Sequence, residues 1–139
     1  MTDRLASSRP QRPYGLGQKS AISARQAAHT RGHRAEIMAA LYLWCLGYRI
    51  RARRFKTSVG EIDLIVTRGR TLVFVEVKAR STVAAAVAAI PPAAYRRLQD
   101  AAHIYRAHHP QFSTFQVRFD LVALAPPCFL RHLDNIDLS

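Results

Sequence analysis

The sequence predicts an α/β fold in which a mixed β-sheet is flanked by helices. Two helical patterns, about residues 21–46 and 92–108, enclose a group of β-rich segments, and a further strand pattern follows the second helix. The chain has 139 residues, enough for one sizeable core, and its hydrophobic fraction of 49% is typical of globular proteins. We therefore expect one domain over residues 21–139, preceded by a flexible basic arm at residues 1–20.

The first helical pattern has an apolar stripe and ends at a glycine. The stripe consists of Ile37, Leu41 and Trp44, with Met38 alongside. Glu36 lies at its edge. Gly47 directly follows the pattern, and glycine is the usual residue just past the end of a helix.

The run YRIRARRFK that comes next predicts an extended edge strand. Alternation places Arg49, Arg51 and Arg53 on one face and Arg54 and Lys56 on the other. Exposed charge of this kind discourages pairing between sheet edges. The strand either follows a phosphate backbone or is a solvated edge, and the pattern does not choose between the two.

Two β-rich runs, EIDLIV and TLVFVEVK, are joined through TRGR and predict a β-hairpin with its turn at Gly69. Because side chains alternate across a strand, each run has one wholly apolar face and one face that carries charge. In the first run, Glu61, Asp63 and Ile65 oppose Ile62, Leu64 and Val66. In the second run, Phe74, Glu76 and Lys78 oppose Val73, Val75 and Val77.

A two-residue turn, Gly69–Arg70, brings the charged faces of the two strands together. In that register Asp63 lies opposite Glu76, and Glu61 lies opposite Lys78. The Cβ atoms of such pairs are about 4.5–5.5 Å apart, so the two carboxylates can share one cation. Without a counter-ion they repel each other, and one is driven toward protonation.

Paired carboxylates suit Mg²⁺, which takes one or two of them and keeps waters and substrate phosphate oxygens as its other ligands. The carbonyl of Val77 is a further candidate ligand, and Lys78 is placed to act on the water or on transition-state charge. In the alternative, Asp63 accepts strand-end hydrogen bonds and Glu61 forms an ordinary ion pair with Lys78. The apolar residues around them argue against a solvated face.

The rest of the chain completes the sheet. STVAAAVAAI predicts a loop or short helix, and the prolines at 91 and 92 suit the entry of the second helix. That helix carries a stripe of Tyr95, Leu98, Ala102 and Tyr105 that should pack on the sheet. FQVRFDLVAL predicts another strand, and PCFLRHLDNI a short closing element.

The charge balance of 21 Lys and Arg against 9 Asp and Glu, a net +12, favours a polyanionic partner, above all nucleic acid rather than a membrane surface. Cys45 and Cys128 lie far apart without metal-type spacing, so we expect buried free thiols in a reducing compartment. No run approaches the ~20 apolar residues of a membrane helix, and the N-terminus has no apolar signal segment. These features predict a cytoplasmic protein.

An ordered set of blocks resembles a known family. AEIMAALYL and LGYRI, then GEIDLI, FVEVKAR and VRFDLVAL, resemble the YraN family, which looks like a branch of the PD-(D/E)XK nuclease superfamily. The resemblance covers residues 31–124 and implies a restriction-endonuclease-like central mixed β-sheet flanked by helices. It also implies that Asp63 and Glu76 are metal ligands, that Lys78 is the catalytic lysine and that Glu36 is an acid near the metal. Asp120 matches a family motif, and we expect it to make a structural contact.

The sequence departs from the family pattern before and within the second helix. Where a Gly-containing loop and then a lysine are expected, this chain has VAAAVAAIPPAAYRRL, with Ala94 near the position of the lysine. Arg96 or Arg97 is the candidate substitute for contacting phosphate.

The function predicted from these features is a metal-dependent endonuclease that hydrolyses DNA, with Mg²⁺ or Mn²⁺ as cofactor. Structured or branched DNA is the candidate substrate, as for a Holliday-junction resolvase, and a homodimer would suit a symmetric junction. The alternatives are an inactive nucleic-acid-binding module and a protein-interaction adaptor. The residues predicted to contact nucleic acid are Arg49, Arg51, Arg53, Arg54, Lys56, Arg80, Arg96 and Arg97.

Overall fold

The computed structural model describes residues 16–127 and 129–137. In chain order the elements are α1 (Leu16–Cys45), β1 (Arg49–Lys56), β2 (Glu61–Arg68), β3 (Thr71–Ala79), α2 (Val83–Ala88), α3 (Pro92–His108), η1 (Pro110–Phe112), β4 (Gln116–Ala125) and β5 (Phe129–Leu133). Two compact units divide between Thr30 and Arg31, and the sheet belongs to the second unit. The single domain over residues 21–139 stays a prediction.

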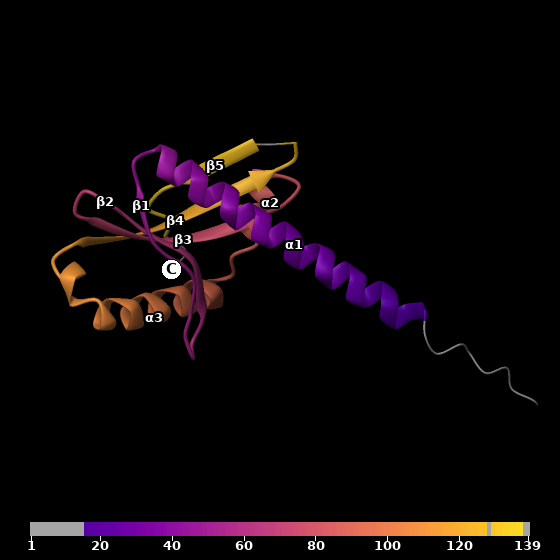
Figure 1. Ribbon diagram of the computed structural model, residues 1–139, viewed down its shortest axis with the longest axis horizontal. Helices are drawn as coiled ribbons and strands as arrows, with labels where there is room; N and C mark the ends of the chain where they lie inside the picture. The colour runs from indigo at the N-terminus through magenta and orange to yellow at the C-terminus, as the bar shows by residue number, and fades with distance from the viewer. Residues whose placement is uncertain (1–15, 128, 138–139) are drawn as a thin grey trace, which may run out of the picture. The chain divides into compact units, whose positions relative to one another are not determined.

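The five strands form one mixed sheet in the order β1-β2-β3-β4-β5 (Figure 1). Strands β3 and β4 run parallel, and the other neighbouring pairs are antiparallel. The connection between the parallel strands contains α2 and α3, as a crossover between parallel strands requires. The predicted α/β fold, with a restriction-endonuclease-like mixed sheet flanked by helices, is confirmed, and β1 is an edge strand as expected.

Helices pack on both faces of the sheet. On one face, α3 buries the predicted stripe, Tyr95, Leu98, Ala102 and Tyr105, in a cluster with Ile62, Ile65 and Phe74. On the other face, Ala35, Ala39 and Leu43 of α1 pack with Leu64, Val66, Val73, Val75 and Val122. Burial of a Leu, Ile, Val or Phe side chain contributes about 1.5–3 kcal/mol, so these two clusters are the main source of stability.

The stripe predicted on α1 is not the buried one. An apolar stripe normally faces the core, yet the side chains of Ile37, Leu41 and Trp44 are 44%, 58% and 62% exposed. Met38 is exposed as well. The helix instead turns its alanines toward the sheet, because small residues allow a closer approach of the two backbones. The same rotation leaves Cys45 exposed, so the prediction of a buried thiol is wrong there, and Cys128 lies outside the described residues.

The ends of α1 differ in how well they were predicted. The helix begins at Leu16, earlier than the expected start at residue 21, so part of the predicted flexible arm is helical; residues 1–15 lie outside the described part. At the other end, Gly47 adopts a φ of +87°. The N–H of Tyr48 donates to the carbonyl of Leu43, and the N–H of Gly47 to that of Trp44. This is a Schellman motif, and it confirms the predicted stop at Gly47.

The remaining elements follow their predictions. The hairpin turns at Gly69, whose φ is +56°, and pairs from Arg68 with Thr71 to Leu64 with Val75 in the predicted register. The Ala-rich segment forms the short helix α2, with the side chain of Thr82 capping its start. Helix α3 begins at Pro92 as expected.

Asp120 makes the structural contact expected of it. Its side chain is fully buried on β4 and accepts hydrogen bonds from both Arg118 Nε and Nη2, from the Asn135 N–H, and from His132 when Nε2 carries the proton. Arg118 also donates to the hydroxyl of Tyr48. The network ties β4 to β5 and to the segment that follows it.

Candidate active site

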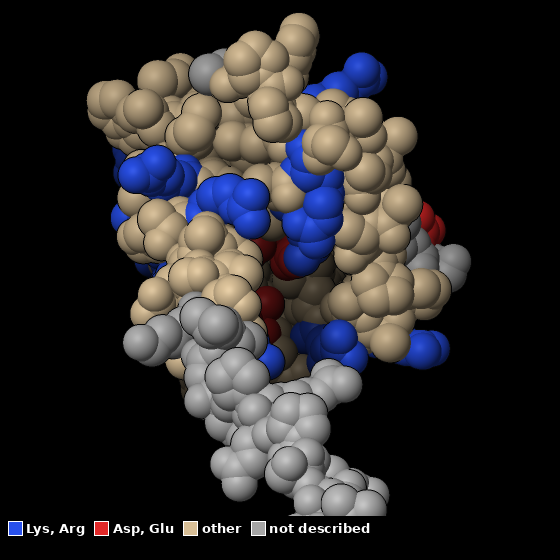
Figure 2. Space-filling view, turned by 90° about the vertical axis from the view of Figure 1, so that its right-hand side faces the viewer, with Lys and Arg blue, Asp and Glu red and all other residues tan. Residues whose placement is uncertain are grey.

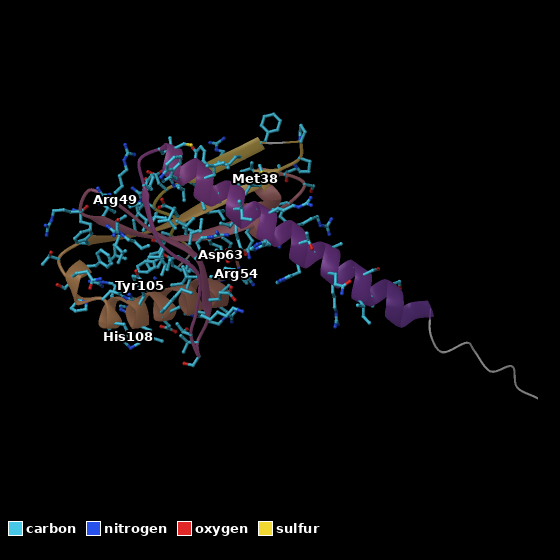
Figure 3. The ribbon with its side chains drawn as sticks, in the orientation of Figure 1. Met38, Arg49, Arg54, Asp63, Tyr105 and His108 are labelled. Carbon is cyan, nitrogen blue, oxygen red and sulfur yellow. The ribbon has the colours of Figure 1, made fainter. Side chains whose placement is uncertain are left out.

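The carboxylates lie where β2 and β3 separate. The paired ladder between the two strands ends at Leu64 and Val75, so Asp63 and Glu76 are not a paired set of the kind expected. Instead, Asp63 Oδ2 accepts a 2.7 Å hydrogen bond from the backbone N–H of Val77. The side chain of Asp63 thereby bridges the gap between the diverging strands, and its orientation is fixed (Figure 3).

The backbone of β1 is distorted beside this point. Arg54 has a φ of +50°, which is uncommon and strained for a residue other than glycine. The ladder pairs Arg53 with Leu64 and Phe55 with Ile62 but skips the pair between them. The face predicted for Ile62 is wrong, because Ile62 packs in the cluster of α3 whereas Leu64 packs in that of α1.

The pKa of Asp63 shows that three carboxylates crowd one another. Burial, followed by the charge of Glu76, raises the pKa of Asp63 from 3.8 to about 7, and the charge of Glu36 adds to the rise. The Val77 hydrogen bond and the charge of Lys78 act in the opposite direction. Negative charge is therefore concentrated at this place, and a bound cation would relieve it.

Glu36 is held near the site from α1. Its side chain is only 14% exposed, and Oε2 has no hydrogen-bond partner. The nearest cationic atoms are Arg54 Nε at 3.7 Å and His33 Nδ1 at 3.9 Å. A buried carboxylate oxygen without a hydrogen bond is costly, so Glu36 retains an unused capacity to bind a donor or a cation.

Lys78 and Glu61 form ion pairs other than the predicted one. Lys78 Nζ lies 2.8 Å from Glu76 Oε1 on the same strand. Glu61 lies 3.4 Å from Arg54 and 3.9 Å from Lys56, both on β1. The suggested ion pair between Glu61 and Lys78 is therefore wrong, because the bend of β2 turns Glu61 toward β1.

A pocket of about 210 Å³ opens beside these residues. Its charged lining residues are Glu61, Glu76, Lys78 and Arg97, and the rest of the lining is glycine or apolar, including Ala94. Asp63 and Glu36 are not among the lining residues. Figure 2 shows acidic atoms at the base of a hollow whose rim carries Lys and Arg side chains.

The chemistry of the donors fits a hard cation. In the described part of the chain, no group of three or more His, Cys, Asp or Glu side chains is arranged to hold a metal ion. Mg²⁺, however, needs only one or two carboxylates beside waters and substrate oxygens. The raised pKa of Asp63 and the unbonded oxygen of Glu36 are the features expected of such a site before a cation neutralises it.

The arginines predicted to contact nucleic acid fall into different places. Arg97 of α3 lines the pocket, whereas Arg96 is exposed and does not. Gly60 packs so closely on Arg97 that an added Cβ would lie 3.2 Å from the Arg97 carbonyl oxygen, which fixes α3 beside β2. Arg80 is exposed and donates to the Ala79 carbonyl, and Arg53 is exposed on β1.

Arg54 is the residue whose placement sequence analysis missed. Its positive φ turns the guanidinium toward Glu36 and Glu61, although simple alternation assigned it to an exposed charged face. Arg49 and Arg51 are exposed at the start of β1, toward the end of the sheet that holds the β2–β3 turn. A β-bulge between Ile50 and Ala52 also breaks the predicted alternation there.

Comparison with known proteins identifies the family. The model of the family described as uncharacterised protein family UPF0102 matches residues 35–124, which include every element from the packed part of α1 to β4. The chain belongs to the UPF0102 family. This is the YraN family that the sequence blocks resembled.

Curated UPF0102 proteins resemble the chain over nearly their whole length. A relative from Chelativorans sp. is 44% identical over 87% of this chain and 97% of its own. One from Rhodopseudomonas palustris strain BisB18 is 46% identical over 82% and 84%, and one from Methylorubrum extorquens 50% identical over 80% and 87%. Within the described residues, no helix of this UPF0102 protein is long and apolar enough to cross a membrane.

Proposed function

We propose that this UPF0102 protein is a metal-dependent endonuclease that cleaves DNA, with structured or branched DNA as its substrate. The observation that carries the proposal is the convergence of Asp63, Glu76 and Lys78 beside a pocket in a strongly basic protein. Glu36 supports the acidic group from a different element. Few structural needs explain carboxylates crowded so closely, because charges that are costly to bury are usually retained for chemistry.

Asp63 and Glu76 would hold Mg²⁺ or Mn²⁺, with the Val77 carbonyl as a further ligand. When bound, the ion supplies Lewis acidity at a phosphate oxygen and lowers the pKa of a water. The Val77 N–H orients the Asp63 carboxylate through one oxygen, Oδ2, and leaves the other available. Glu36, with its unbonded oxygen, either strengthens this negative field or hydrogen-bonds the water.

Lys78 acts at the reacting phosphate. Its ammonium group lies 2.8 Å from Glu76 and faces the pocket, where it can stabilise charge that develops on the phosphate oxygens. Arg97, also at the pocket, replaces the lysine expected near Ala94 and holds the neighbouring backbone. Arg54, Lys56 and Arg80 add positive charge around the carboxylates.

Cleavage of a panel of labelled DNAs tests the proposal. Single-stranded, duplex, flap and four-way-junction DNAs are incubated with Mg²⁺ or Mn²⁺ and the native protein, Asp63→Asn, or Asp100→Asn. Asp100 is exposed on α3 outside the pocket and serves as the matched control. We expect metal-dependent cutting by the native protein and by Asp100→Asn, and none by Asp63→Asn. Cutting that survives Asp63→Asn would place the chemistry elsewhere.

A non-catalytic nucleic-acid-binding module is the second candidate. Two observations favour it: the expected helix lysine is absent at Ala94, and Lys78 is already paired with Glu76. Such a module should bind DNA without cutting it, and Asp63→Asn should leave binding unchanged or improve it, because a repulsive charge is lost. A protein adaptor would instead lack the steep loss of DNA affinity with salt.

A further inference from the structure

We propose that the end of the sheet at the β2–β3 turn is a second nucleic-acid-binding surface, separate from the candidate active site. Four arginines define this surface, which we term the arginine end: Arg49, Arg51, Arg68 and Arg70. All four are exposed. The inference goes beyond the proposed cleavage, because a protein that only bound DNA would use the surface equally.

The fold brings these four residues together from two strands and a turn. Arg49 pairs with Thr67, and Arg51 Nε donates a 2.8 Å hydrogen bond to the hydroxyl of the same threonine. Arg68 is the last residue of β2, and Arg70 completes the turn into β3. The turn lies at the left edge of Figure 1, away from the C-terminal end of β3.

Three of the guanidinium groups are held in place by aromatic rings. Arg51 lies over Phe112, Arg68 over Tyr48 and Arg70 over Phe115, each with Cζ 5.4 Å from the ring centroid. Arg70 Nη2 also donates to the hydroxyl of Thr114 at 2.6 Å. These contacts reduce the side-chain entropy that binding a ligand would otherwise cost, and each guanidinium still has free donors.

The charge of the arginine end is not neutralised. Among the ion pairs of residues 16–127 and 129–137, the Lys and Arg members are Arg54, Lys56, Lys78 and Arg118. None belongs to the arginine end. Like charges gathered on one surface repel each other, and a bound polyanion relieves that repulsion.

Nucleic acid fits this surface better than a membrane does. A planar guanidinium fork binds phosphate through two hydrogen bonds, and arginines fixed in position suit regularly spaced phosphates. Interfacial membrane binding requires apolar side chains next to the basic ones. The larger exposed hydrophobic side chains of the described residues lie mainly on α1, outside the arginine end.

The surface is distinct from the candidate active site. Asp63 and Arg68 are five positions apart on β2, which at about 3.3 Å per residue separates them by roughly 17 Å. Figure 3 labels Arg49 at one side of the sheet and Asp63 nearer its middle. A segment of nucleic acid on the arginine end is therefore not the segment at the scissile position, and a substrate with more than one arm could use both.

Salt-dependent binding tests the inference. Anisotropy of a labelled DNA duplex, with Ca²⁺ present and no cleavage required, is measured over a range of NaCl concentrations. The test variant is Arg68→Gln/Arg70→Gln, and the control is Arg25→Gln/Arg131→Gln, which removes two exposed arginines elsewhere. Losing two phosphate contacts should lower the slope of log K against log salt by about 1.8 in the test variant alone.

Each outcome decides the matter. Equal losses in the two variants would mean that net charge alone matters, and no loss in the test variant would mean that the surface is not used; either result overturns the proposal. So does unchanged duplex binding with lost binding to anionic phosphatidylglycerol vesicles. If Arg68→Gln/Arg70→Gln does not fold, as judged by its melting curve, Arg49→Gln/Arg51→Gln must show the same drop. Weakened binding by a protein that never cuts DNA would support this surface and contradict only the nuclease.

Discussion

The backbone N–H of Val77 donates a 2.7 Å hydrogen bond to Asp63 Oδ2 across the gap between β2 and β3. Strand pairing has already ended at Leu64 and Val75, so a side chain does here what a backbone carbonyl does elsewhere in the ladder. The arrangement holds a carboxylate in a fixed position close to Glu76 and Glu36. Its negative charge is costly without a cation, and that cost can be measured.

Asp63→Asn should stabilise the metal-free protein at about pH 8. The pKa of Asp63 is raised to about 7 in the fold from 3.8, so its contribution to stability is present below pH 3.8 and is lost as pH rises through about 7. Asparagine still accepts from Val77 but carries no charge. The free energy of unfolding should increase on the order of 1–3 kcal/mol, measured by urea denaturation with EDTA. A decrease at this pH would mean that the carboxylates do not crowd one another.

Lys78→Met should separate chemistry from metal binding. The ammonium group is paired with Glu76, so its loss leaves both carboxylates free and should leave Mn²⁺ affinity unchanged or higher. Removing a group that stabilises transition-state charge should slow cleavage by about 100-fold or more. Single-turnover rates at saturating Mn²⁺ measure the effect. Native rates in this variant would remove Lys78 from the reaction.

Gly60→Val should destabilise the protein through the contact with Arg97. An added Cβ would lie 3.2 Å from the Arg97 carbonyl oxygen and 3.3 Å from its Cβ, and both are atoms that cannot simply turn away. We expect a loss of about 1–3 kcal/mol. Gly32→Ala is the control, because its Cβ meets nothing within 4 Å in a helix, and it should raise stability by about 0.5–1 kcal/mol. Thermal melting of both variants distinguishes the two signs.

Asp120→Asn should lower stability near neutral pH and flatten its dependence on acid. Burial alone would raise the pKa of Asp120, but hydrogen bonds from His132, Arg118 and the Asn135 N–H lower it below 3.8. Its contribution is therefore present above pH 3.8 and is lost as pH falls through the lower folded value. Breaking a buried ion pair costs about 3 kcal/mol or more at pH 7. Denaturation curves over the acid range, native against variant, should converge at low pH; parallel curves would contradict the assigned role.

Sequence patterns predicted the elements well because local signals mark them. Gly69 sets the hairpin register, Gly47 ends α1 and Pro92 begins α3. The buried face of α1 was missed because the helix is apolar on two sides. Periodicity favours large residues such as Trp44, whereas packing selected Ala35 and Ala39.

The candidate site was predicted in its residues but not in its geometry. Strand alternation assumes a regular ladder, and the positive φ of Arg54 breaks that regularity opposite Asp63. No local sequence signal marks such a distortion at an arginine. The bend changes the partner of Glu61 and brings a backbone N–H to Asp63 in place of a facing carboxylate.

Direct measurement of Mn²⁺ binding tests most sharply whether these carboxylates hold a cation. Titration followed by electron paramagnetic resonance counts free Mn²⁺ without any need for DNA or catalysis. The native protein and Asp100→Asn should bind one ion with equal affinity, and Asp63→Asn should bind it at least about tenfold more weakly. A native protein that binds no Mn²⁺, or an Asp63→Asn variant that binds it as tightly, would contradict the assignment of a metal site between β2 and β3.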